Sequence, residues 1–79
     1  MRYARRGGAE RPARGLTPRQ REIAALVAEG YDNRRIADAL RSTPGTISTH
    51  LQSIRARLRV RGREEIAAWV RRHGLGRPG

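Results

Sequence analysis

Two Thr-Pro pairs, Thr17-Pro18 and Thr43-Pro44, constrain the fold of this chain more than any other feature. A threonine hydroxyl can accept from the backbone N–H three residues further on, and proline suits the first helical position, where no donor is needed. At the first pair, Gln20 can also reach back to the backbone of Thr17 and complete a capping box. Helices are therefore predicted to begin at both places.

Apolar residues recur at helical spacing after each start signal and predict four helices. The first spans about residues 18–29, and Asp32 caps a second of about two turns. The third spans 44–58. The fourth opens at 63–65 with two acids in its first turn, and Gly74 ends it. No internal repeat or strand-like alternation competes with this interpretation.

The core available to these helices is small. The chain has 79 residues, of which 37% are hydrophobic, with only one Trp, two Tyr and no Phe or Cys. We therefore predict an all-α fold, a compact four-helix bundle in which the second and third helices form a helix-turn-helix. Disulfides, a thiolate nucleophile and Cys-ligated zinc are excluded. Neither enzymatic activity nor a cofactor or metal is expected.

The ends of the chain differ in composition from its centre. Residues 1–15 contain five arginines and almost nothing apolar, which predicts a flexible arginine-rich arm. The predicted folded domain covers 16–75, and 76–79 are expected to be a disordered tail. We find no run of the ~18 to 20 apolar residues that a membrane span needs and no signal peptide. A cytoplasmic location without membrane association is therefore expected.

Positive charge is concentrated on part of the chain. The formal net charge is +11, with a sequence pI near 11.9. Residues 42–62 hold four arginines and no acid, and residues 1–15 hold five arginines and one acid, so the excess is concentrated on the predicted third helix and the arm. A small basic domain with clustered arginine is typical of nucleic-acid binders.

The third helix has two distinct faces. Ile47, Leu51, Ile54 and Leu58 share one face, and small, polar and basic residues occupy the other. Sequence readout in the major groove needs hydrogen-bonding side chains early on such a helix, because these side chains meet the base edges. The predicted base-reading residues are Ser48, Thr49 and Gln52.

Other polar and basic residues surround this face. Those predicted to hold backbone phosphates are Asn33, Arg34, Thr43, Thr46, His50, Arg55, Arg59 and Arg61. The alternative is a basic face that is simply solvated. Catalysis by His50 would need a partner and a cleft, so phosphate contact and packing remain its two interpretations.

The predicted fourth helix carries a second candidate surface. Trp69 is assigned to its outer edge together with Glu65, Ala68 and Arg72. An aromatic side chain of that size is rarely left in water on a monomer. Trp69 is therefore either a lid over the core or, with those three neighbours, part of a dimer interface.

Three segments together resemble the LuxR-type helix-turn-helix domain, the output domain of LuxR and NarL/FixJ transcription factors. They are LTPRQREIAALVAEGYDNRRIADAL (16–40), PGTISTHLQSIRARL (44–58) and VRGREEIAAWVRRHGL (60–75). The resemblance implies a four-helix domain that controls transcription by binding inverted-repeat DNA as a dimer, with dimer contacts through the last helix. It also implies base contacts for Ser48, Thr49 and Gln52 and backbone contacts for Asn33, Thr46 and His50.

The chain departs from the family pattern at several positions. Ser48 stands where the family usually has Lys, and Arg59 where it usually has Gly. Two other functions stay open, a domain similar to region 4 of a sigma factor and a basic protein-interaction module. RNA polymerase or a regulatory protein is a further candidate partner. The chain is interpreted as either a stand-alone regulator or the output domain of a longer one.

Overall fold

The structure is a computed structural model that describes residues 15–74. It contains four helices, α1 (Pro18–Ala28), α2 (Asn33–Leu40), α3 (Pro44–Leu58) and α4 (Arg63–His73), and no strand within those residues. The predicted all-α class and the four-helix order are confirmed. The predicted arm, apart from Gly15, and the predicted tail lie outside the described residues.

The helix starts form as their capping residues predict. In the first, the backbone N–H of Gln20 donates to Oγ1 of Thr17, and the backbone N–H of Thr17 donates to Oε1 of Gln20, each at 3.0 Å. Asp32 accepts from the N–H of Arg35 at 2.8 Å. Helix α1 ends at Ala28, one residue before the predicted end, because the chain turns into a left-handed glycine, Gly30, with φ 95°.

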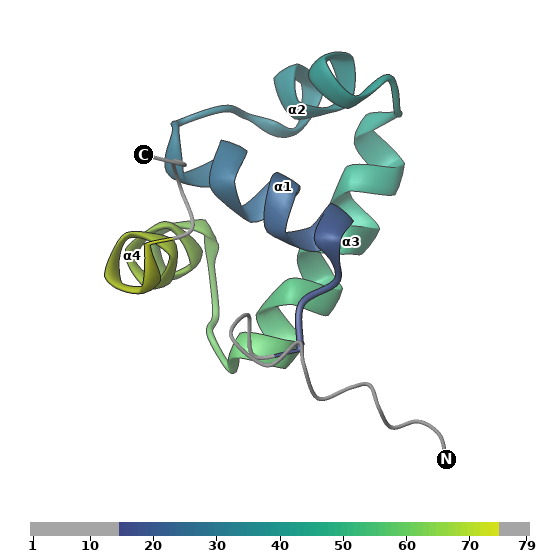
Figure 1. The fold of residues 1–79 in the computed structure, drawn as a ribbon. Coiled ribbons are helices and arrows are strands. Elements are labelled where there is room, and N and C mark those ends of the chain that lie inside the picture. The colour runs from purple at the N-terminus through teal and green to yellow at the C-terminus, as the bar shows by residue number, and fades with distance from the viewer. Residues whose placement is uncertain (1–14, 75–79) are drawn as a thin grey trace.

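The four helices enclose one aliphatic core. Helix α1 lies in the middle of the molecule and packs against α3 and α4, while α2 packs mainly on α3 (Figure 1). The fully buried large side chains are Ile23, Ile36, Ile47, Ile54, Ile66 and Val70. Each helix contributes to this set, so the predicted apolar faces are the ones that meet in the core.

Helices α2 and α3 form the predicted helix-turn-helix. Arg41 ends α2 in the left-handed conformation, with φ 57°, and the N–H of Ser42 donates to the carbonyl of Ala37 at 2.8 Å. Thr43 then caps α3 by accepting from the N–H of Thr46 at 3.2 Å. This tight turn holds α2 across α3 (Figure 1), and it leaves the first turns of α3 at the surface.

Arg59→Gly is expected to raise the free energy of unfolding by about 1 kcal/mol, because Arg59 adopts φ 59°, a conformation that costs L-residues energy and glycine almost nothing. Urea unfolding followed by circular dichroism measures the change. The matched control is Ala56→Gly, which puts the same residue inside α3 and should lower stability. If both glycines destabilise the domain equally, the left-handed strain at Arg59 is refuted.

Candidate nucleic-acid interface

The predicted base-reading residues lie on the exposed side of α3. Ser48, Thr49 and Gln52 are all exposed, whereas Ile47 and Leu51, on the inward face of the helix, are buried. The helix is therefore held by its apolar face and presents its polar face to the surface. Exposure of these three residues agrees with the prediction, while their contact with bases stays a prediction.

The hydrogen-bonding capacity of the three side chains differs. The Thr49 hydroxyl donates to the Gly45 carbonyl one turn earlier, at 3.2 Å. Its proton is therefore in use, and its lone pairs and methyl group remain for a ligand. Among residues 15–74, the side chains of Ser48 and Gln52 form no hydrogen bond, so both can donate and accept.

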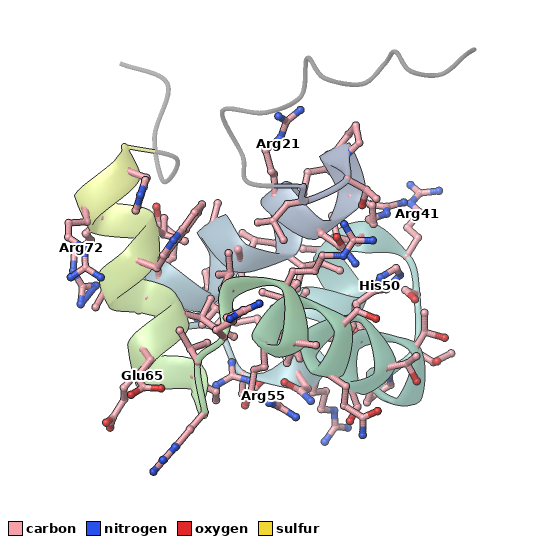
Figure 2. The ribbon with its side chains drawn as sticks, turned by 90° about the horizontal axis from the view of Figure 1, so that it is seen from below. Arg21, Arg41, His50, Arg55, Glu65 and Arg72 are labelled. Atoms are coloured by element: carbon pink, nitrogen blue, oxygen red, sulfur yellow. The ribbon has the colours of Figure 1, made fainter. Side chains whose placement is uncertain are left out.

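Five of the residues predicted to hold phosphates have basic side chains. Arg34, Arg59 and Arg61 are exposed, and His50 and Arg55 are half-buried. His50 and Arg55 point to different sides of α3 (Figure 2). Cationic or donor groups on both sides of a recognition helix are what two phosphate strands bordering a groove require.

The threonines before and in the first turn of α3 have local partners. The Thr43 hydroxyl donates to Oγ1 of Thr46 at 3.0 Å, in addition to accepting from the Thr46 N–H. Thr43 therefore acts mainly as the helix cap. Since Oγ1 of Thr46 already accepts, the Thr46 hydroxyl proton is the one left to donate to a phosphate.

Asn33 has a partner that the sequence reasoning missed. Its Oδ1 accepts from Nη1 of Arg63 at 2.6 Å, and Nη2 of Arg63 donates to the carbonyl of Tyr31. The Arg35 guanidinium lies 4.2 Å from the centroid of the Tyr31 ring. Arg63 lies 30 residues beyond Asn33, so no local pattern in the sequence indicates the pair.

Arg57 is a second residue that the sequence reasoning left without a role. Its Nη1 donates to the carbonyl of Gly15 at 2.7 Å. Gly15 has φ 89°, a conformation that favours glycine. Arg57 thereby holds the entry to α1 against the last turn of α3.

The placement of Trp69 at the outer edge of α4 is wrong. Its side chain is only 7% exposed and belongs to the core, as the lid interpretation expects. Trp69 lies at the edge of the inward face that Ile66 and Val70 define, and the surrounding helices bury it. The His73 ring stacks on it, with centroids 4.1 Å apart and Nδ1 2.9 Å from the Trp69 carbonyl.

The rest of the predicted dimer surface is exposed. Glu65, Ala68 and Arg72 lie on α4, and Figure 2 shows Glu65 and Arg72 pointing away from the other helices. Glu65 also accepts a hydrogen bond from the backbone N–H of Arg61, which stabilises the start of α4. Its local role and a contact with a second copy are compatible, because a carboxylate can accept several hydrogen bonds.

Other kinds of site find no support between residues 15 and 74. That part of the chain has no group of three His, Asp or Glu residues that could hold a metal ion. It also has no helix with the length and hydropathy of a membrane span.

Comparison with known proteins agrees with this geometry. Residues 14–70 match the model of the family described as bacterial regulatory proteins, luxR family. An HTH-type transcriptional regulator of Mycobacterium tuberculosis is 42% identical over 77 residues, which cover 91% of this chain and 9% of that protein. The nitrate/nitrite response regulator protein NarL of Escherichia coli K12 is 37% identical over 67 residues, covering 85% of this chain and 31% of NarL.

A third relative matches the same region. The response regulator protein VraR of Staphylococcus aureus is 38% identical over 60 residues, covering 76% of this chain and 29% of VraR. The chain thus spans less than a third of the length of each of these relatives. The matched segment contains all of α1, α2 and α3 and most of α4. The chain belongs to the luxR family of bacterial regulatory proteins and carries its helix-turn-helix DNA-binding domain.

Proposed function

We propose that this domain binds double-stranded DNA sequence-specifically by placing α3 in the major groove and thereby regulates transcription. The observation that carries the proposal is the outer face of α3. Its exposed early side chains can hydrogen-bond, no acid occurs between 42 and 62, and His50 and Arg55 flank it on two sides. Ser48, Thr49 and Gln52 read bases, and the flanking groups hold phosphates. Binding to a bacterial chromosome places the protein in the cytoplasm.

Gln52→Ala is expected to weaken binding to the selected site by about 10- to 100-fold, because a glutamine can make a bidentate contact with adenine. Binding to a scrambled duplex should not change. A site is first selected from a random duplex library, and fluorescence anisotropy then compares both duplexes at about 50 and 200 mM salt. The matched control is Ser53→Ala, another exposed polar residue of α3.

Two outcomes would contradict this function. Equal binding of the wild-type chain to both duplexes, lost at the higher salt, would mean that charge alone attracts DNA. No binding to either duplex would favour a protein-interaction module instead. If only Ser53→Ala changed the preference, the assignment of base-reading residues would be wrong, although the function would stand.

We also propose that two copies bind an inverted repeat through α4. The small, exposed Ala68 lies between Glu65 and Arg72, at helical spacings of three and four residues. If two α4 helices cross antiparallel at Ala68, Glu65 of one copy faces the partner's Arg72. Two-fold symmetry then gives the same contact a second time, between Arg72 of the first copy and the partner's Glu65. One short helix supplies little area, so the dimer should be weak in the absence of DNA.

Arg72→Glu is expected to weaken self-association by roughly 10-fold, because it replaces two ion pairs of about 1 kcal/mol or less each with repulsion. Sedimentation equilibrium measures the dimer. Binding to an inverted repeat should weaken by a similar factor, while binding to a single half-site should change little. Arg71→Glu alters charge equally at the neighbouring exposed position and is the control. Unchanged self-association in Arg72→Glu would refute this interface.

A further inference from the structure

We propose that Arg63 is a positioning residue for DNA binding, which orients the side-chain amide of Asn33 so that its Nδ2 donates to a DNA phosphate. This inference rests on the proposed function, because it assumes that Asn33 contacts the DNA backbone. It adds a role for a residue of α4 that does not itself need to contact DNA.

The contact geometry carries the first step. Nη1 of Arg63 lies 2.6 Å from Oδ1 of Asn33, and Nη2 of the same guanidinium donates to the carbonyl of Tyr31. Arg63 is the first residue of α4, Asn33 is the first residue of α2, and Tyr31 lies in the loop before α2. A single planar fork therefore joins the start of α4 to both the loop and the helix that follow α1.

Hydrogen-bond chemistry carries the second step. A guanidinium only donates, so the atom of Asn33 that faces it has to be the amide oxygen rather than the nitrogen. The amide is planar, and its NH₂ group consequently points away from Arg63. Asn33 is half-buried, so part of the side chain remains reachable from outside. An NH₂ group that points away from Arg63 suits an anionic phosphate, whereas a flipped amide would present an oxygen that phosphate repels.

The shape of arginine carries the third step. Two donors of one rigid guanidinium reach two acceptors here, which a lysine ammonium cannot reproduce with the same geometry. Tyr31, whose carbonyl takes one branch of the fork, is also covered by the Arg35 guanidinium at 4.2 Å. Two arginines thus hold the loop, and the amide of Asn33 is oriented before DNA binds.

The test compares charge-conserving variants on the selected duplex. Arg63→Lys keeps the net charge and should weaken binding about 10-fold, as should Asn33→Ala, since each loses one charge-assisted hydrogen bond to phosphate. Arg71→Lys, at an exposed position of the same helix, is the matched control and should bind as the wild type does. Because Arg63 acts through Asn33, Asn33→Ala combined with Arg63→Lys should bind no more weakly than Asn33→Ala alone.

Two results with the Arg63 variants would overturn the proposal. One is wild-type affinity in Arg63→Lys. The other is a double variant whose loss equals the product of the two single losses, because Arg63 would then act independently of Asn33. Asn33→Asp provides a test with Arg63 intact, since the carboxylate keeps the Arg63 contact but cannot donate. Asn33→Asp should bind DNA more weakly than Asn33→Ala, and its unfolding temperature should be no lower than that of Asn33→Ala. The reverse order of affinities would also overturn the proposal.

A spectroscopic measurement separates this inference from the proposed function. In the free protein, the chemical shifts of the Asn33 side-chain NH₂ protons should differ from those of an unstructured asparagine. Arg63→Lys should move them toward the unstructured values. Arg71→Lys should leave them in place. If these results hold but the wild type binds selected and scrambled duplexes equally, the contact exists and the proposed function has failed. If the wild type binds the selected duplex more tightly than the scrambled one, but Arg63→Lys leaves the Asn33 NH₂ resonances unchanged, the positioning role has failed.

Discussion

Ile54→Ala is expected to lower the free energy of unfolding by about 2 to 5 kcal/mol, because it removes three buried carbons and leaves a cavity. Ile54 is 0% exposed and lies on the inward face of α3, the helix that packs against both α1 and α2. A domain of this size rarely has more than about 3 to 5 kcal/mol of stability. We therefore expect most Ile54→Ala molecules to be unfolded near 37 °C, as circular dichroism would show.

The neighbouring position provides the control for this effect. Ser53→Ala places the same residue in the same helix at an exposed site, and its stability should differ from the wild type by no more than about 0.5 kcal/mol. Ile54→Val should fall between them, at about 0.5 to 1.5 kcal/mol. A loss below 1 kcal/mol in Ile54→Ala would contradict the described packing of α3.

Ser48→Asp is expected to weaken binding to the selected duplex by about 100-fold or more. The substitution places a carboxylate on the face of α3 that we propose enters the groove, where like charges cost several kcal/mol. Ser48 is exposed, and residues 44–58 contain no Asp or Glu, so the new carboxylate would be the first negative charge on this helix. An acid in the first half of a helix does not oppose the helix dipole, so stability should change little. Fluorescence anisotropy and urea unfolding measure the two quantities.

The control for Ser48→Asp changes the net charge equally but elsewhere. Arg21→Gln removes one positive charge from α1, on the opposite side of the molecule from Arg55 (Figure 2). It should weaken binding by only a few-fold, through the overall field of the domain. Comparable losses in the two variants would show that DNA affinity follows net charge and that α3 has no special place in the complex.

The helix boundaries could be predicted closely because their signals are local. Thr17, Asp32 and Thr43 each accept from a backbone N–H three residues later, as their residue types and positions predict. The outer face of α3 was equally accessible to prediction, since the apolar positions Ile47, Leu51 and Ile54 define its buried side. The luxR-family match then agrees with the resemblance that these segments carry.

The placement of Trp69 shows the limit of that reasoning. Spacing puts Trp69 at the boundary between the inward and outward faces of α4, and size alone allowed either a lid or a contact with a second copy. The surrounding helices select the lid, because their packing leaves Trp69 only 7% exposed, and His73 stacks on its ring. A residue at the edge of a helical face is buried or exposed according to its neighbours, which no single helix specifies.

By itself, the sequence determined the four helices, their caps, their apolar faces and the concentration of positive charge around α3. These properties depend on residues within about four positions of one another. Only the tertiary structure decided which arginines hold the fold. Arg63 reaches Asn33 across 30 residues of chain, and Arg57 reaches Gly15 across 42. The sequence does not distinguish a solvent-exposed arginine from one that donates to a distant carbonyl. A long flexible side chain forms such a contact only once the helices have packed.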